Sequence, residues 1–514
     1  MRLLARIRRS ADAFAATLLT LFDGCGRLDS VTAALVISAV WIVPMAIVKL
    51  RLLNHFILTS DIATYETILH NTGFDFSDRS FLFLNSYNSD TFLTEHFAPT
   101  FALVAPLQWL IPHPIFLVIL QPLLIALAGV GIWKVSRLVL ERYGAPQSAR
   151  WLPLLFQVVY LFNYSTISAT ADTIYGFHHD SLIPPLMVWA LACVLQSRWR
   201  LSAVLLVLLL GVKENIPIIL AAFFAACLPL QWLMPRRAAL TGIVACAIFF
   251  GGCYLFEFNS NNVHVNLVFQ YLDRSKLTEA WGWLPAWSGF RFFWPGLLAI
   301  PFALPAVGEL SLQLMGHTIE LDWHSFPLMT LAVISTMFTC VRLMALVQRW
   351  RVVLLASYLV VIGGLVVPVL AQGGASYSNI FRASEQLPAV VDGGALRAVS
   401  GSIPRDARLC ISSDLMPFFG NRRSMLHPNW VNEANYILIN RRRREDDAAK
   451  ADEFLRTAPG SDAAAAHFKA EIADVLRGYG YDTALFDAVD RLIVEHKISV
   501  VRSEGTLSLY KTSD

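Results

Sequence analysis

Long apolar runs separated by short polar segments fill the chain between residues 31 and 371. About 20 apolar residues in a helix cross the hydrocarbon core of a bilayer, so these runs predict about ten membrane-spanning helices. The predicted crossings are Val31–Leu50, Pro114–Trp133, Trp151–Thr170, Leu182–Gln196, Leu201–Val212 with Ile216–Met234, Thr241–Phe258, Phe290–Met315, Ser325–Met344 and Val352–Ala371. The segment Leu201–Met234, interrupted by Lys213, is expected to form a helical hairpin. Phe290–Met315 is either one crossing or a bent hairpin, and the basic residues after Met344 favour the hairpin.

The distribution of charge orients these crossings. Residues 1–30 begin with four Arg within Met1–Ser10 and predict a cytoplasmic amphipathic segment, because cytoplasmic flanks of membrane helices are rich in Lys and Arg. Residues 51–96 carry six acids and two Arg and are expected to form a loop on the outer face. Only one crossing can connect this outer loop to the basic, cytoplasmic segment that follows Trp133. The shorter apolar run, residues 97–112, is therefore predicted to lie as a helix at the outer interface.

The last 143 residues, 372–514, differ in composition from the rest of the chain. They hold 18 Lys and Arg and 19 Asp and Glu, nearly half of the chain's 41 basic and 38 acidic residues. Short strands are predicted at Ala407–Ser412 and Tyr436–Asn440, helices at Asp447–Arg456 and Ala463–Arg477, and a hairpin over Ile498–Tyr510. The predicted fold is therefore a polytopic α-helical membrane body, residues 31–371, with a C-terminal soluble α/β domain outside the cytoplasm.

Composition excludes several classes of protein. Hydrophobic residues make up 56% of the chain and charged residues 15%, with a mean hydropathy of +0.53, whereas soluble domains average about 25% charged residues. A net charge of +3 is too small to suggest a nucleic-acid partner. The seven Cys show neither a disulfide framework nor the spacing of a thiolate metal site.

Four groups of ionisable residues are expected at the outer face, where such residues are costly and often functional. They are Asp61 with Glu66, Glu95 with His96, the run His178, His179 and Asp180, and the run Lys213, Glu214 and Asn215. His324 and Arg291 are weaker additions. A carboxylate there can act as a general base or bind a divalent metal, and a His with an Asp can share a metal or a phosphate.

Each group also has a structural interpretation. Asp61 can cap a helix while Glu66 stays solvated, and His96 can anchor the chain at the interface. Lys213 must either pair with its neighbour Glu214 or bind an anion.

The same residues resemble the motifs of a bacterial family of predicted membrane proteins, DUF2079, which is related to the GT-C glycosyltransferase superfamily. The family's Asp-x-x-x-x-Asp segment is similar to Asp61–Glu66, and its Asp-His-Phe-x-Pro is similar to Glu95–Pro99. Phe-His-Pro-Glu resembles Phe177–Asp180, Lys-Glu-Asp resembles Lys213–Asn215, and a late His-Tyr element resembles the surroundings of His324. Glu stands for Asp at residue 66, and Asn replaces an acid at residue 215.

The resemblance implies a GT-C-like fold in the bacterial inner membrane and a sugar donor linked to polyprenyl phosphate. Asp61, with Glu66 second, would be the catalytic base. Lys213, His178 and His324 would hold the donor phosphate. His96, Asp180 and Glu214 would orient these groups or bind a divalent cation, Mg²⁺ or Mn²⁺.

The favoured function is therefore transfer of a sugar from a polyprenyl-phosphate donor to an extracytoplasmic acceptor. Two alternatives remain open at this stage. A transporter or flippase could line a pathway with the same buried charges. A non-catalytic envelope assembly protein could act through its tail.

Overall fold

The computed structural model describes residues 10–20, 24, 28–258 and 325–513, with short gaps at 59, 74–81, 83–91, 95, 147–148, 173–174, 231–232, 413, 421–424, 427, 442–443, 461 and 478–482. The chain separates into two compact units. Unit 1 comprises residues 1–43, 123–170 and 180–377, and unit 2 comprises residues 44–122, 171–179 and 378–514.

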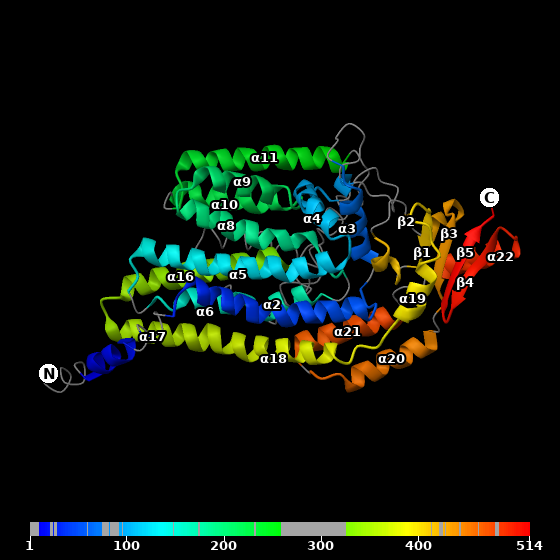
Figure 1. Ribbon diagram of the computed structural model, residues 1–514. Coiled ribbons are helices and arrows are strands. Elements are labelled where there is room, and N and C mark those ends of the chain that lie inside the picture. Colours follow the sequence, from blue (N-terminus) through cyan, green and yellow to red (C-terminus); the bar gives the residue numbers. More distant parts are fainter. Residues whose placement is uncertain are drawn as a thin grey trace, which may run out of the picture. The chain divides into compact units, whose positions relative to one another are not determined.

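Unit 1 is built of apolar helices (Figure 1). They include α6 (Leu152–Leu161), α7 (Tyr164–Ala171), α8 (Ile183–Leu195), α9 (Trp199–Leu210), α10 (Ile216–Leu230), α11 (Arg236–Phe258), α16 (Ser325–Val347), α17 (Arg351–Val361) and most of α18 (Val367–Ser384). Neighbours along the chain pack together, as α8 with α9 and α10 with α11. Two further helices, α2 (Val31–Asn54) and α5 (Ile115–Tyr143), continue into unit 2.

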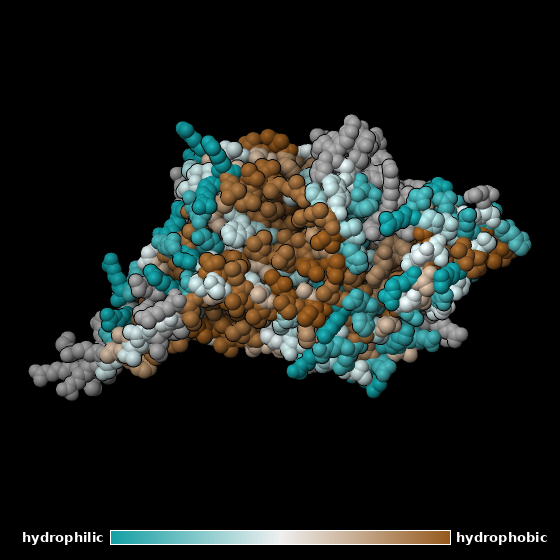
Figure 2. Space-filling model, viewed as in Figure 1, coloured by the Kyte–Doolittle hydropathy of each residue, from teal (hydrophilic) through white to brown (hydrophobic). Residues whose placement is uncertain are grey.

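The surface of these helices is apolar, as a lipid-facing surface must be. Leu240, Val244 and Ile248 of α11 and Val204 and Val207 of α9 are exposed. Figure 2 shows apolar side chains gathered over the helices of unit 1. Exposed apolar side chains on successive turns are expensive in water and favourable in lipid.

Five helical segments of the described chain are long and apolar enough to cross a membrane. They are Val31–Asn54, Ile115–Tyr143, Arg236–Cys253, Phe326–Val347 and Arg351–Ser384. Helices α8 and α10, with 13 and 15 residues, are shorter than their predicted runs, and α9 has 12 residues, as its predicted run does. The predicted hairpin at 290–315 lies outside the described residues. The expected total of about ten crossings therefore stays a prediction.

The crossing predicted as one helix over Trp151–Thr170 is instead bent by 46° between α6 and α7. Asn163 stands at the break, where its side-chain oxygen accepts a hydrogen bond from the Ser165 amide at 2.9 Å. An Asn that satisfies the first amides of a helix favours a helix start at that position. A single polar residue thus divides an apolar run that hydropathy treats as continuous.

The last apolar helix also differs from its predicted extent. Helices α17 and α18, joined by a short π-helical turn, continue to Ser384 and not to Ala371. Within unit 1, the Tyr377 hydroxyl donates to the Trp41 carbonyl oxygen at 2.8 Å. This contact lies beyond the predicted end, where the sequence becomes more polar but the helix continues.

Unit 2 contains the segments that follow the first crossing. Helix α3 (Ser60–Asn71) is buried on nearly every side, and the 3₁₀ helix η2 (Pro99–Val104) leads into α4 (Ala105–Leu110). The predicted interfacial helix over 97–112 is therefore two short helical pieces. Leu103, Leu107 and Leu110 are exposed, which is the property expected of a segment that lies in a membrane interface.

The tail of unit 2 forms a five-stranded sheet of order β2-β1-β3-β5-β4. The strands are β1 (Leu409–Ile411), β2 (Met425–Leu426), β3 (Tyr436–Asn440), β4 (Ile498–Glu504) and β5 (Leu507–Thr512). β1 is parallel to β2 and β3, while β5 is antiparallel to β3 and β4. Helix α22 (Thr483–Val494) contributes Leu485, Val489 and Leu492 to one apolar core with the sheet. Helices α19 (Gly393–Ser400), α20 (Arg444–Thr457) and α21 (Ala463–Arg477) complete the tail.

The tail elements confirm most of the predicted secondary structure. The ends of β3 and α21 coincide with their predicted bounds, and β1 lies within Ala407–Ser412. Helix α20 is longer than predicted, since it begins at Arg444 inside the basic run.

Candidate functional site

Helix α3 carries the first group of candidate residues. Its start at Ser60 and Asp61 places an acid in the first turn, which favours a helix N-terminus electrostatically. Tyr65, Glu66 and Thr67 follow one turn later and are all buried. The side chain of Asp61 lies outside the described residues, as do Glu95 and His324.

Glu66 is fully buried, not solvated, which rules out the structural alternative considered for it from sequence. Its Oε1 accepts a hydrogen bond from Gln108 Nε2 of α4 at 3.3 Å. Among the described residues, its Oε2 has no hydrogen-bond partner. Burial raises the pKa of Glu66 to about 8, so its carboxyl group holds a proton at neutral pH.

A loop of the tail packs against this part of α3, within unit 2. The Thr67 hydroxyl donates to the Gly420 carbonyl oxygen at 2.9 Å. A Cβ atom added at Gly420 would lie 2.6 Å from Glu66 Oε2. Glycine is therefore favoured at residue 420, because a side chain there would force Glu66 or the loop to shift.

His178 and His179 directly follow a turn at Gly176. Gly176 has a φ of +67° and packs against Leu58, a combination that excludes other residues. The 3₁₀ helix η4 (His179–Leu182) then leads into α8, whose first turn contains Pro184 and Pro185. Proline is favoured in the first turn of a helix, so the sequence places the His pair directly before a helix start.

Aromatic side chains of unit 2 surround the two imidazoles. Tyr65 Oη lies 3.2 Å from His179 Nδ1, and the rings of His178 and His179 stack with centroids 4.5 Å apart. The His96 ring lies 5.4 Å from that of His179, and Phe92 and Phe101 contact the same ring. The structure thus brings together His96 and the His pair, members of the second and third candidate groups, and adds Tyr65 of α3, which no candidate group contained.

Within unit 1, Lys213 lies in the turn between α9 and α10 and is buried. Its Nζ forms an ion pair of 2.7 Å with Oδ2 of Asp180, which is also buried. Asp180 lies 33 positions before Lys213 in the chain, and Glu214 is half-buried in the same turn as Lys213. A buried ion pair of this kind needs both members, because removal of one leaves an uncompensated charge.

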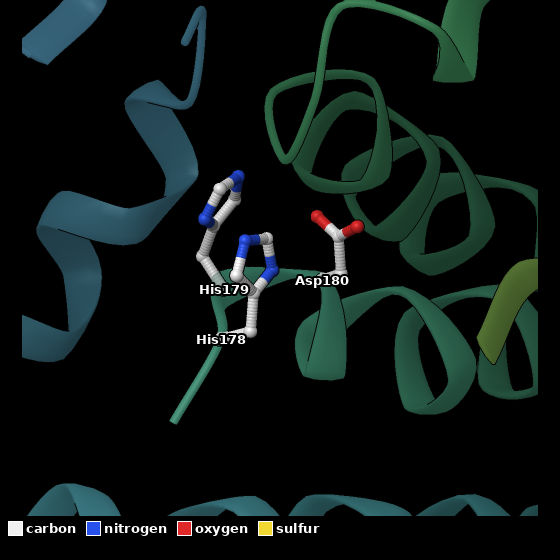
Figure 3. A group of neighbouring side chains, drawn as sticks. All are labelled: His178, His179 and Asp180. Carbon is white, nitrogen blue, oxygen red and sulfur yellow. The ribbon is translucent and has the colours of Figure 1, made fainter. Parts of the chain in front are cut away.

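One group of at least three metal-ligating side chains occurs in the part of the chain that the structure describes. His178, His179 and Asp180 each offer one ligand atom, and these atoms all lie within 4.8 Å of one another. Figure 3 shows the two imidazoles side by side and the Asp180 carboxylate directed toward the same side. Neither His96 nor Glu214 belongs to this group.

Sequence reasoning missed a further buried cation, Lys49 of α2. Its Nζ donates to Gln121 Oε1 at 3.0 Å and to the Asp172 carbonyl oxygen at 3.2 Å, all within unit 2. Lys49 stands at the end of an apolar run, where a Lys is ordinarily assumed to reach the interface. Asp172, an acid at the end of a later apolar run, was the one sequence feature that could have suggested a buried partner for Lys49.

Comparison with known proteins places most of the chain, from residue 78 to residue 458, in a family. A family model described as "Predicted membrane protein (DUF2079)" matches residues 78–259 and 254–458, which together make up more than half of the chain. Among curated proteins, none matches.

Proposed function

The chain belongs to the DUF2079 family of predicted membrane proteins, and on that premise we propose that it is a glycosyltransferase that uses polyprenyl-phosphate-linked sugars. It is a multi-pass membrane protein with a small C-terminal sheet. The proposal adds a GT-C-like body of about ten crossings in the bacterial inner membrane, with the N-terminus in the cytoplasm and residues 372–514 outside. The acceptor is extracytoplasmic.

One observation carries the proposal: the contact between Tyr65 and His179. It holds α3, which bears Asp61 and Glu66, against the segment that bears the two imidazoles. Glycosyl transfer needs a carboxylate near the acceptor hydroxyl and cationic or hydrogen-bonding groups at the donor phosphate. The segments that bear these two kinds of residue lie more than 100 positions apart in the chain, and the contact between Tyr65 and His179 joins them, which supports the proposal.

In the proposed reaction, Asp61 takes the proton of the acceptor hydroxyl group. The acceptor oxygen forms a bond to the anomeric carbon of the sugar, and the bond from that carbon to the phosphate oxygen breaks. Polyprenyl phosphate leaves with the electron pair. Lys213, His178 and His324 stabilise its negative charge by charge and hydrogen bonding.

Glu66 has a different role from Asp61 at neutral pH. A carboxyl group with a pKa of about 8 is protonated at pH 7 and cannot accept a second proton. Glu66 therefore donates a hydrogen bond in the proposed site, and the role of base belongs to Asp61. His96, Asp180 and Glu214 orient the groups around them, and Asp180 does so through its ion pair with Lys213.

The proposal is tested by assaying the purified protein with a set of polyprenyl-phosphate sugars. We expect transfer by the wild type and a loss of about 100-fold or more in kcat for Asp61→Asn, the magnitude typical of a missing general base. Lys213→Met combined with Asp180→Asn removes the ion pair without leaving a lone buried charge and is expected to raise the KM for the donor. Glu433→Gln, at an exposed position of the tail, is the matched control.

Equal activity in the wild type and Asp61→Asn would eliminate the proposed base. Absence of transfer with every donor would eliminate the enzyme and favour a transporter, a flippase or an envelope assembly protein. Circular dichroism and thermal unfolding of each variant separate loss of chemistry from loss of fold.

A further inference from the structure

We propose that His178, His179 and Asp180 bind one divalent transition-metal ion, of the class that includes Zn²⁺ and Mn²⁺. The ligand atoms of all three lie within 4.8 Å of one another, and all three side chains are buried. Three ligands of this kind within one short segment converge on a volume that one ion can fill after small side-chain rotations (Figure 3).

Two of the three ligands contact a second polar side chain, as ligands do in natural metal sites. A ligating His almost always has its second ring nitrogen hydrogen-bonded, and ligating carboxylates are hydrogen-bonded in turn. Here Tyr65 Oη lies 3.2 Å from His179 Nδ1, and Lys213 Nζ donates to Asp180 Oδ2 at 2.7 Å. When the Nδ1 hydrogen points to the Tyr65 oxygen, the lone pair on Nε2 of His179 is available to an ion.

The donor set selects the class of metal. Two imidazole nitrogens and one carboxylate oxygen suit Zn²⁺, Mn²⁺ and Fe²⁺, whereas Mg²⁺ and Ca²⁺ prefer oxygen ligands alone. A site with three protein ligands leaves positions for water or substrate, which is typical of catalytic and not of structural ions. The sequence prediction of Mg²⁺ or Mn²⁺, made for His96, Asp180 and Glu214, stays a prediction; of these two ions, the donor set of His178, His179 and Asp180 favours Mn²⁺.

The charges around the group predict coupling to an anion. Asp180 pairs with Lys213, and the two imidazoles carry no charge when they ligate a metal, so a divalent ion adds two positive charges to a buried group of side chains. A phosphate oxygen in an open ligand position balances that charge. The ion would then bind both His178 and the donor phosphate. This last step rests on the proposed function. Metal binding itself does not.

The test is metal binding by the full-length protein in detergent. Protein stripped with chelator is equilibrated separately with Zn²⁺, Mn²⁺ and Mg²⁺, desalted, and analysed by elemental mass spectrometry. We expect about one Zn²⁺ or Mn²⁺ per chain, little Mg²⁺, and at least a tenfold lower affinity in His178→Ala and His179→Ala. His467→Ala, in helix α21 of the tail, is the control and should bind as the wild type does.

A second measurement does not depend on the folding of variants. The electron paramagnetic resonance spectrum of bound Mn²⁺ in the wild type should show coupling to imidazole nitrogen. No bound ion in the wild type, equal binding in the His variants, or a spectrum without nitrogen coupling would each overturn the proposal.

The two proposals fail in different ways. An ion bound with no sugar transfer from any donor keeps the metal site and removes the enzyme. Sugar transfer by the chelator-stripped protein keeps the enzyme and removes the metal site from its mechanism.

Discussion

Single buried ionisable groups are the most informative features of this molecule at the scale of the residue. Glu66, Lys49 and Asp180 are all buried, and each occupies a different electrostatic environment. Glu66 stays uncharged through burial, whereas Lys49 and Asp180 each meet a polar or oppositely charged partner. Burying a charge is costly, and the protein avoids this cost in two ways: Glu66 is protonated, whereas Lys49 and Asp180 are paired with polar or charged groups.

Replacing Glu66 by Gln should change how stability depends on pH. The folded-state pKa of about 8 lies above the ordinary value of 4.5, so the folded protein holds a proton that the unfolded chain releases. The stability of the wild type should fall as the pH rises from about 4.5 to about 8, by at most about 1.4 kcal/mol per pH unit from this group. Glu66→Gln has no carboxyl group to ionise and should not show this loss.

Thermal unfolding of both proteins between pH 5 and pH 9 measures the effect. The advantage of Glu66→Gln should grow with pH up to about 8 and then level off. Glu433→Gln is the control, since that residue is exposed. Parallel pH profiles for the wild type and Glu66→Gln would contradict the assignment of a buried, protonated carboxyl group.

Lys49→Met should be strongly destabilising although it introduces an apolar residue into a membrane helix. The substitution removes the donor to Gln121 and to the Asp172 carbonyl oxygen, and it takes away the positive charge that attracts the buried Asp172 carboxylate. Breaking one member of a buried pair typically costs about 3–5 kcal/mol. The change in melting temperature of the detergent-solubilised protein measures it.

A second substitution separates charge from packing. Lys49→Met combined with Asp172→Asn should recover part of the lost stability, because no lone charge is left behind. Lys497→Met, at an exposed position, should leave the melting temperature unchanged. An unchanged melting temperature for Lys49→Met would show that the Lys49 ammonium group does not stabilise the buried Asp172.

At the scale of the element, the most important contact is the one between α3 and the tail loop that contains Phe418 and Gly420. The loop contributes Gly420, whose carbonyl oxygen accepts from Thr67 and whose Cα faces Glu66. Phe418, two residues earlier, stacks with Phe56 at the end of α2, with ring centroids 4.2 Å apart. Within unit 2, a loop of the tail therefore packs directly on α3 and on the end of α2.

Gly420→Ala tests this contact. The added methyl group would lie 2.6 Å from Glu66 Oε2 and 3.0 Å from the Ala63 carbonyl oxygen, so α3 or the loop must shift. Overpacking of this kind costs about 1–3 kcal/mol. We expect a lower melting temperature and, under the proposed function, lower transfer activity.

The matched control is Gly374→Ala in α18, where an added methyl group meets nothing within 4 Å. That substitution replaces a helical Gly by a better helix former and should be neutral or slightly stabilising. Equal melting temperatures for the two variants would show that the loop does not pack against α3 as described.

At the scale of the whole molecule, the protein combines a multi-pass membrane body with a mixed five-stranded sheet. The proposed orientation places the sheet outside and the loop between α16 and α17 in the cytoplasm. The basic residues of that loop, including Arg349, support this orientation by the positive-inside rule.

Membrane-impermeant thiol labelling of intact cells tests the orientation. Lys497→Cys in the tail should react, and Arg349→Cys should react only after permeabilisation. Both positions are exposed, and all six Cys among the described residues are buried. Both variants are made in a Cys25→Ser background, which removes the seventh Cys. The reverse pattern would invert the proposed topology and place the candidate site on the cytoplasmic side.

Sequence alone was sufficient for the properties that depend on local composition. Apolar runs located the long helices α2, α5, α11 and α16, and the change in charge density located the tail with its strands β1 and β3. The motifs also identified Glu66, His178, His179, Asp180 and Lys213 as residues to examine. Local patterns suffice here because a lipid-facing surface and a strand are each determined by neighbouring residues.

Only the tertiary structure decided which of these residues meet. Lys213 forms an ion pair with the distant Asp180, and His179 contacts Tyr65 from a segment more than 100 positions earlier. The bend at Asn163, the buried Lys49 and the burial of Glu66 by Gly420 also required coordinates. The physical reason is that pairing and desolvation depend on groups brought together from distant parts of the chain, and no local pattern encodes those distances.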